Sequence, residues 1–324
     1  MNAPDRAAWL AQRRLGLGGS DIGAVLGLSK YRTPVDVWME KTGRAPGAEE
    51  TLQMRFGTYA EEFVASEYSA ITGNAVQRYT PMLHHPSAPI LGNVDRLVIP
   101  AGQKRAAHQR EIRTDIGLEC KTASAFAAMD DAEWGAPGSD MVPPSYLVQC
   151  VTYMALTGCG HWDLAVLFGN QEVRVYHLAR DRELENEIVA RAAEWWQRHV
   201  VADVAPAPVC DDDVRALYPK SRPVTVEAGG PCLQALAALR NLRAEIKALQ
   251  AQESDAVLTL KAAMGEAEAL VWQGQTLATW KSAKPTRKTD WKAAAAAAGI
   301  DAALIDRFTT EAAGSRRFLL KDEK

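Results

Sequence analysis

The chain has 324 residues, 47% of them hydrophobic and 24% charged, and a formal net charge of −3. This composition is typical of a globular protein, and the charge excludes a general attraction to nucleic acid, so a polyanion would have to meet a local cluster of Lys and Arg. The five cysteines are scattered, which argues against a disulfide framework, a structural zinc site or an iron–sulfur cluster. With no signal-peptide pattern and no apolar window of about 18 residues, we expect a cytoplasmic protein that does not associate with membranes.

The first part of the chain has the periodicity of three helices. Residues 20–27 predict a short helix with Ser20 or Asp21 as its N-cap. Residues 33–43 predict a second helix, and a longer amphipathic helix follows at 54–73.

The pattern changes after residue 74. Segments rich in β-branched and alternating apolar residues predict strands at 75–85, 90–100, 110–123 and 161–179. A helix that begins with two prolines interrupts them at 143–158, and a helix rich in Ala and Trp follows at 183–200. This order predicts an α/β or α+β core of roughly 200 residues.

A Pro- and Asp-rich stretch separates this core from the rest of the chain. We expect a core domain over 1–207, a linker over 208–224 and an extension over 225–324. The extension has four regular patterns: a helical hairpin or coiled-coil arm at 233–265, a β-hairpin at 269–283, a helix at 292–299 and a strand at 316–321.

Three charged side chains belong to two neighbouring predicted strands. Asp95 follows a strand and a turn, whereas Glu119 and Lys121 lie one residue apart in the next strand and therefore project to the same face, with Cys120 pointing into the core. Two carboxylates from adjacent strands form an oxygen site suited to Mg²⁺ or Mn²⁺, and a neighbouring lysine can position a water or neutralise charge. The alternative is an exposed strand that carries a Glu–Lys ion pair.

Further polar residues lie on two of the predicted helices. Glu61 is a third carboxylate that could face the site, whereas Glu62 would point elsewhere, because adjacent helical residues do not share a face. Tyr146, Gln149 and Tyr153 fall on one stripe of a later helix, which is unusual for a surface that serves only packing. The alternative is a polar stripe that is hydrogen-bonded inside the fold.

Together these residues resemble the PD-(D/E)XK nuclease signature, with Asp95, Glu119-x-Lys121, Glu61 upstream and Gln149-x-x-x-Tyr153 downstream. The opening RRLGLGGSD is similar to that of the YqaJ-like viral recombinase and lambda exonuclease family. The resemblance covers residues 9–196, and its parts occur in the family's order. It departs from the family at Val94, which replaces the proline that usually precedes the first Asp.

The resemblance implies a fold and an activity. The fold would be a restriction-endonuclease-like α/β (α+β) core, with a central mixed β-sheet flanked by helices, plus a C-terminal helical and β-hairpin extension. The activity would be that of a Mg²⁺-dependent 5′→3′ exonuclease, with Mn²⁺ as a substitute, that degrades one strand of linear double-stranded DNA to mononucleotides and leaves a 3′ overhang. The implied partners are DNA ends and a phage single-strand annealing protein, and the implied assembly is a homotrimer.

The family's catalytic residues carry over onto matching positions. Asp95, Glu119 and the backbone carbonyl of Cys120 would bind the metal, and Glu61 would help to hold a second ion. Lys121 would activate the attacking water. Chemically this is a displacement in which the ions stabilise the attacking and leaving oxygens.

The resemblance also implies residues that contact DNA: Gln149 and Tyr153 at the scissile region, and Arg13, Arg14, Gly19 and Ser20 at the terminal 5′-phosphate. A terminal phosphate carries more charge than an internal diester and favours bidentate binding by guanidinium. The glycines permit close backbone approach, and the start of the short helix favours an anion. The family's phosphate-binding arginine aligns best with Arg13, with Arg14 nearly as good, and the alternative is a tight turn between helices.

Two other functions remain open at this point. One is an endonuclease of the same superfamily, and the other is a DNA-end binding protein without activity. The second is disfavoured because Glu61, Asp95, Glu119 and Lys121 are all present.

Overall fold

A computed structural model describes residues 11–45, 51–129, 132–311 and 318–320. The chain divides into two compact units, Met1–Pro219 and Lys220–Lys324, which we describe separately. The division falls inside the segment that we expected to be a linker.

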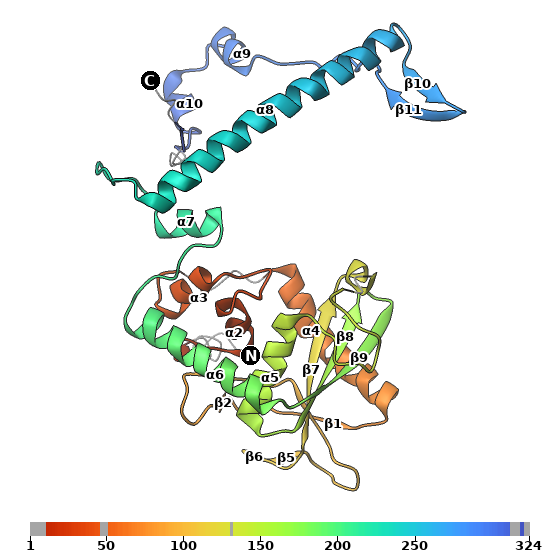
Figure 1. Ribbon diagram of the computed structural model, residues 1–324, viewed down its shortest axis with the longest axis vertical. Coiled ribbons are helices and arrows are strands. Elements are labelled where there is room, and N and C mark those ends of the chain that lie inside the picture. The colour runs from red at the N-terminus through yellow and green to blue at the C-terminus, as the bar shows by residue number, and fades with distance from the viewer. Residues whose placement is uncertain (1–10, 46–50, 130–131, 312–317, 321–324) are drawn as a thin grey trace. The chain divides into compact units, whose positions relative to one another are not determined.

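The first unit is built on a five-stranded mixed sheet (Figure 1). The strand order is β1 (Val76–Arg78), β4 (Arg96–Val98), β7 (Ile116–Ala123), β8 (His161–Phe168) and β9 (Glu172–Ala179). The pair β7–β8 is parallel and the other pairs are antiparallel. Two small hairpins add to it, β2 (Leu83–His84) with β3 (Leu91–Gly92) and β5 (Ala107–His108) with β6 (Glu111–Ile112). The expected mixed α/β architecture is confirmed.

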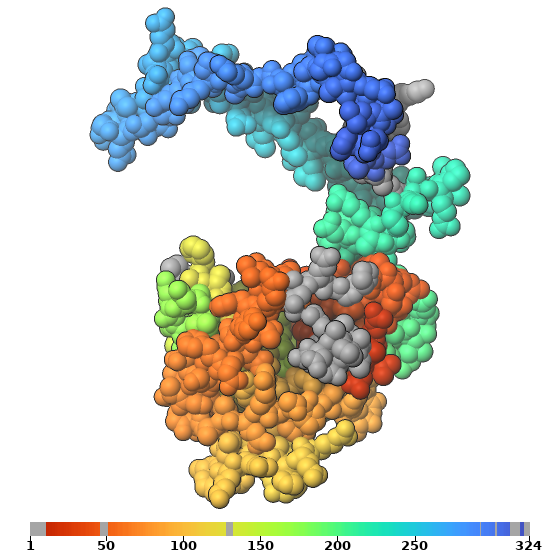
Figure 2. All heavy atoms as spheres, turned by 180° about the vertical axis from the view of Figure 1, so that it is seen from behind, coloured from red at the N-terminus to blue at the C-terminus, as the bar shows by residue number. Residues whose placement is uncertain are grey.

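Helices cover both faces of this sheet. On one face, α4 (Leu52–Thr72) packs against β7, β8 and β9. On the other face lies α5 (Pro144–Thr157), which makes the crossover that a parallel strand pair requires, and α2 (Gly19–Val25) and α6 (Arg182–Trp195) pack against it. Seen from the opposite side, the orange α4 region forms part of the surface of this unit (Figure 2).

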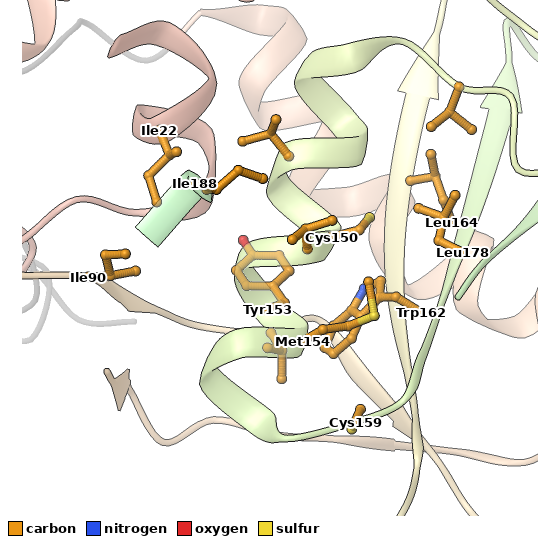
Figure 3. Packing of buried hydrophobic residues seen from close by; sticks show 14 of the residues in the cluster. Ile22, Ile90, Cys150, Tyr153, Met154, Cys159, Trp162, Leu164, Leu178 and Ile188 are labelled. Carbon is orange, nitrogen blue, oxygen red and sulfur yellow. The ribbon is translucent and has the colours of Figure 1, made fainter. Parts of the chain in front are cut away.

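Two hydrophobic clusters hold these layers together. The larger one lies around α5, where Ile22 and Ile188 face Cys150 on one side and Trp162 and Leu164 lie on the sheet side (Figure 3). The smaller one lies under α4 and includes buried side chains of that helix and of three strands: Val64, Ala65, Tyr68, Leu118, Cys120, Ala165 and Val175. Alternate residues of β7 therefore face α4, which leaves Glu119 and Lys121 on the α5 side.

The helix ends follow local capping rules. Helix α3 (Pro34–Lys41) begins after Thr33, whose side chain accepts a hydrogen bond from Asp36 N. Helices α4 and α5 both end at a glycine with positive φ, Gly73 and Gly158. The expected N-cap of α2 is wrong, because the helix begins at Gly19 and Gly18 is its N-cap.

Residues near the end of the first unit are more regular than a linker. Helix α6 continues into a π-helix, η2 (Trp196–Val201), and a short helix α7 spans Asp211–Leu217. Asp213 of α7 is buried and accepts hydrogen bonds from Thr33 Oγ1 at 2.7 Å and from Val209 N at 2.8 Å. This part of the expected linker is therefore packed structure.

The second unit contains one long helix at the position where we expected a helical hairpin or a coiled-coil arm. Helix α8 spans Gly230–Met264 without interruption. The expected β-hairpin is present as β10 (Ala269–Trp272) and β11 (Gln275–Thr279), followed by α9 (Trp291–Ala297) and α10 (Ala302–Asp306). Of the strand expected at 316–321, only 318–320 lie within the described residues, and they are irregular. No described helix combines the length and apolar composition that a membrane crossing would require.

Candidate active site

A polar cavity of about 240 Å³ opens at the point where two strands of the sheet stop pairing. Strand β4 pairs with β7 only through Gly117 and Leu118, so the edge of β7 is open from Glu119 onward. The cavity is lined by α4, by the turn before β4 and by this open edge: Gly57, Thr58, Glu61, Val64, Asp95, Glu119, Cys120, Lys121 and Thr122. The four charged residues expected from the sequence therefore line one cavity.

The side chain of Asp95 binds the backbone of β7 where β4 no longer pairs with that strand. Its Oδ2 accepts a hydrogen bond from the backbone N–H of Cys120 at 2.9 Å, which fixes the carboxylate against β7. Burial raises the pKa of Asp95 well above its ordinary value, and the nearby Glu119 carboxylate raises it further. Two acidic groups are thus held together where water solvates them poorly.

Glu119 is buried, and only one of its two carboxylate oxygens has hydrogen-bond partners among the described residues. Its Oε1 accepts hydrogen bonds from Lys121 Nζ and Gln149 Nε2, both at 2.6 Å. Its Oε2 is buried and has no hydrogen-bond partner among the residues that the structure describes. A buried carboxylate oxygen without a partner is costly, so this atom is available to a cation or a water.

Lys121 is held in its charged form. Burial alone would lower its pKa, but the carboxylates of Glu119 and Asp95 overcome that effect and raise the pKa above its ordinary value. The Nζ also lies 5.7 Å from the centroid of the Tyr146 ring, within the range of a cation–π contact. In this arrangement Lys121 is a positive group beside the carboxylates rather than a free base.

Gln149 and Tyr153 of the stripe on α5 are hydrogen-bonded inside the fold, as in the alternative interpretation, and Gln149 also contacts Glu119. Gln149 Nε2 donates to the Tyr153 hydroxyl at 2.9 Å as well as to Glu119, and both side chains are buried. Gln149 therefore connects α5 to the carboxylate on β7. Tyr153 supports the amide of Gln149 and is not itself exposed to a substrate.

Glu61 lines the cavity, but its carboxylate is already paired with a cation. Arg96 Nη1 donates to Glu61 Oε1 at 2.5 Å, and Arg78 Nη2 lies 3.5 Å from the same oxygen. Glu62, which we expected to point elsewhere, also binds this guanidinium, with Arg96 Nη2 at 2.6 Å from its Oε2, although its side chain is 78% exposed. Arg96 is a site residue that the sequence reasoning missed, and its only signal was its position next to Asp95.

The residues fit a divalent cation at one position better than at two. Within the described parts of the chain, no three His, Cys, Asp or Glu side chains form a ready metal cluster. Asp95 and Glu119 nevertheless supply hard oxygen donors, an unpartnered oxygen and a mutual repulsion that a cation would relieve. Glu61 could join them only by exchanging Arg96 for an ion.

A second charged cluster lies behind the glycine-rich opening. Asp21 is fully buried, and its carboxylate lies 2.7 Å from Lys41 Nζ, 2.7 Å from Arg32 Nη1 and 3.9 Å from Arg13 Nη2. Burial opposes ionisation, but Lys41, Arg32 and Arg13 outweigh it and lower the pKa of Asp21 to about 2. Lys41, which is also buried, was not expected from the sequence.

The start of α2 differs from the anion pocket that the sequence suggested. The backbone N–H of Gly18 donates to Asp21 Oδ2 at 2.9 Å, so the protein's own carboxylate occupies this helix end. The side chain of Arg13 is 28% exposed beside Asp21, whereas Arg14 and Ser20 are exposed to solvent. The structure therefore separates the environments of the two arginines.

Gly18 and Gly19 are closely packed against neighbouring side chains. A Cβ at Gly18 would lie 3.1 Å from Arg13 Nη2 and 3.3 Å from Asp21 Oδ2. A Cβ at Gly19 would lie 3.0 Å from Gln149 Cγ and 3.2 Å from the Tyr153 ring. The glycines thus bring the opening of the chain against the residues that contact Glu119.

Comparison with known proteins agrees with the family expected from the motifs. Residues 8–160 match the YqaJ-like viral recombinase domain. The uncharacterized protein YqaJ of Bacillus subtilis (strain 168) is 35% identical over 206 residues, which cover 62% of this chain and 59% of that protein. This region of the chain is therefore similar to the YqaJ-like viral recombinase family, and the chain spans 59% of the length of that relative.

Two solved structures are similar to part of the chain. An alkaline exonuclease (LHK-Exo) from Laribacter hongkongensis is 20% identical with a TM-score of 0.47, and the match covers 60% of this chain and 93% of that one. A phage related exonuclease from Haemophilus somnus 129PT is 13% identical with a TM-score of 0.40, and the match covers 60% of this chain and all of the other, at 100%.

Proposed function

We propose that the chain is a Mg²⁺-dependent 5′→3′ exonuclease that degrades one strand of linear double-stranded DNA to mononucleotides and leaves a 3′ single-stranded overhang. The observation that carries this proposal is the buried pair Asp95 and Glu119 beside Lys121, with Glu119 Oε2 left unpartnered. The family match, which places a viral recombinase domain over the same residues, supports it.

Asp95, Glu119 and the backbone carbonyl of Cys120 would hold Mg²⁺, with Mn²⁺ as a substitute. The bound ion would supply Lewis acidity toward the scissile phosphate and the attacking water. The Cys120 N–H, which binds Asp95 Oδ2, keeps that carboxylate in place. A second ion would compete with Arg96 for Glu61, so we assign Glu61 a secondary part.

Lys121 and Gln149 act on the same carboxylate. Because Lys121 is charged beside Glu119, it orients the attacking water and neutralises developing negative charge. Gln149 donates to Glu119 Oε1 and fixes its orientation, and the family resemblance further implies a contact with the scissile region. Tyr153 supports Gln149.

Recognition of the DNA end is assigned to the opening of the chain. Arg13 is partly exposed and lies beside the cluster of Asp21, Arg32 and Lys41, where a terminal phosphate would find positive charge. Gly19 gives this region its close approach to α5. Arg14 and Ser20, both exposed, are further contacts in the proposal.

The partners are proposals from the family resemblance. They are duplex DNA ends, a phage single-strand annealing protein that takes up the 3′ overhang, and two further copies of the chain in a homotrimer. Light scattering of the purified chain is expected to give three times the chain mass, and a stable monomer at assay concentrations would contradict the ring.

The experiment that tests the activity uses linear and covalently closed plasmid with Mg²⁺, with Asp95→Ala as the inactive control. Wild type is expected to digest only the linear form. Loss of the closed form would indicate an endonuclease of the same superfamily. Binding of linear DNA without digestion by wild type would indicate a silent DNA-end binding protein.

A further inference from the structure

Three large aromatic side chains of the second unit are exposed. The relative exposure is 66% for Trp272, 48% for Trp280 and 78% for Trp291. Tryptophan is highly buried on average in folded proteins, so three exposed ones within 20 residues of chain need a reason.

The hairpin β10–β11 places the first two of these rings. Trp272 ends β10 directly before the turn at Gln273 and Gly274, which both have positive φ, and it is paired with Gln275. Trp280 follows β11, and its backbone N–H donates to Glu268 O at 2.9 Å. The hairpin lies at one end of α8 (Figure 1), and Trp272 borders its turn whereas Trp280 follows the end of its second strand.

The chain after the hairpin is strongly basic. Lys281, Lys284, Arg287 and Lys288 give this stretch four positive charges without an acidic residue between them, in a chain whose net charge is −3. Residues 281–290 form no helix or strand, and Trp291 follows them. One cation already contacts a ring, since Lys261 Nζ lies 5.4 Å from the Trp280 centroid.

We infer that residues 269–291, which we call the Trp–Lys segment, bind single-stranded nucleic acid. Bases would stack on Trp272 and Trp291, and phosphates would bind the Lys and Arg side chains between the tryptophans. Exposed aromatic rings combined with positive charge are what strand binding without sequence preference requires. The inference deepens the proposed function, because a single DNA strand is what that exonuclease would leave behind.

A membrane surface is the other polyanion that tryptophan and lysine could bind. Proteins that lie on membranes commonly do so through a helix with one apolar and one basic face. The Trp–Lys segment is a hairpin followed by irregular chain, and its basic residues lie outside any described helix. Charge and aromatic exposure without an amphipathic helix favour a nucleic acid strand.

The test measures fluorescence anisotropy of an oligothymidylate of about 20 nucleotides with a 5′-hydroxyl end, long enough to cover a usual strand-binding site. The full chain is titrated in EDTA, so that metal-dependent cleavage and recognition of a 5′-phosphate play no part. Trp272→Ala combined with Trp291→Ala is expected to weaken binding by about tenfold or more. Replacement of both residues by Phe should retain most of the affinity, because a stacking ring remains.

The charges are tested with a matched control. Lys284→Gln with Lys288→Gln should weaken binding and reduce its dependence on salt. Arg243→Gln with Lys247→Gln removes the same charge from the exposed surface of α8 and should leave binding unchanged. Circular dichroism of each variant checks that the exposed substitutions leave the fold intact.

Unchanged oligonucleotide binding in the Trp→Ala and Lys→Gln variants would overturn the inference. So would Trp-dependent binding to vesicles containing phosphatidylserine without binding to the oligonucleotide. These results do not depend on catalysis: an inactive chain that binds the strand through the tryptophans refutes only the proposed nuclease. An active chain whose strand binding ignores them refutes only this inference.

Discussion

Gln149 donates a hydrogen bond from Nε2 to Glu119 Oε1 at 2.6 Å, and so joins the helix that crosses the sheet to the carboxylate at its open edge. The same side chain lies against Gly19, where a Cβ would approach its Cγ to 3.0 Å. The side chain of Gln149 therefore lies between the glycine-rich opening and the candidate metal site and contacts both.

This connection predicts different effects for two glycines of α2. Gly19→Ala should push Gln149 and Tyr153 away and lower the rate of DNA digestion by about tenfold, roughly the loss of 1.4 kcal/mol of positioning. Gly23→Ala is the control, because its Cβ would meet Ser145 at an ordinary 3.6 Å. It should be neutral or stabilise the helix by up to about 1 kcal/mol. Equal rates of DNA digestion by the two variants would show that digestion does not depend on the present position of Gln149.

The carboxylate pair predicts a stability effect of metal that requires no substrate. Because burial and Glu119 raise the pKa of Asp95, the ionised pair destabilises the metal-free fold as pH rises. Asp95→Asn, which keeps an acceptor for Cys120 N, should therefore be more stable than wild type in EDTA at neutral pH. Mg²⁺ at a hundredfold excess over its dissociation constant should stabilise wild type by about 2.7 kcal/mol and leave the variant unchanged. Urea unfolding measures the free energy of unfolding in EDTA and in Mg²⁺. Equal stabilisation of wild type and variant by Mg²⁺ would mean that the ion binds elsewhere.

The buried Asp21 predicts a pH-dependent contribution with the opposite sign. Its pKa falls from 3.8 to about 2 on folding, so its stabilising effect is complete above pH 3.8 and is lost as pH falls through about 2. The shift corresponds to about 2 kcal/mol. The free energy of unfolding of Asp21→Asn should lie below that of wild type by at least this amount at neutral pH, and the gap should narrow only in strong acid. A gap that is constant down to pH 2 would show that the ionised carboxylate is not what stabilises the cluster.

The two arginines of the opening should differ in their effect on the end group of DNA. Arg13 is held beside Asp21, whereas Arg14 is exposed, so Arg13→Ala should remove most of the preference for 5′-phosphate over 5′-hydroxyl ends and Arg14→Ala should remove little. Initial digestion rates of the two duplexes measure this preference. Retention of the full preference in both variants would mean that the glycines serve only the packing of α2 on α5.

Local pattern was enough to predict most of the elements and the residues at the site. The alternation of β7 fixes which side Glu119 and Lys121 face, and the prolines and glycines at the ends of α5 fix its limits. Asp95 was expected beside them because the two predicted strands are adjacent. These inferences depend on periods and turn residues, which the sequence contains.

The partners of charged groups could not be predicted in the same way. Arg96 binds both Glu61 and Glu62 because its long side chain reaches α4 from β4, a contact between residues 35 and 34 positions apart. Lys41 meets Asp21 through the packing of two helices. Such pairs depend on the assembled fold and leave no local pattern.

The second unit shows where composition misled the prediction. The long helical periodicity and mixed charges of residues 233–265 predicted a helical hairpin or a coiled-coil arm, yet residues 233–264 contain no Gly or Pro, so no helix-breaking residue interrupts α8. Likewise the three aspartates at 211–213 were assigned to a linker, although acidic residues favour the first turn of a helix, as in α7.

The most direct test of the proposed exonuclease uses linear duplex DNA with different labels on the 5′- and 3′-terminal nucleotides of one strand. With Mg²⁺, the 5′ label should be released first and as a mononucleotide, and the 3′ label should stay in the polymer until late. EDTA and Asp95→Ala should each abolish release. Release of the 3′ label first, oligonucleotide products, or undiminished release in EDTA would contradict a metal-dependent 5′→3′ exonuclease centred on Asp95 and Glu119.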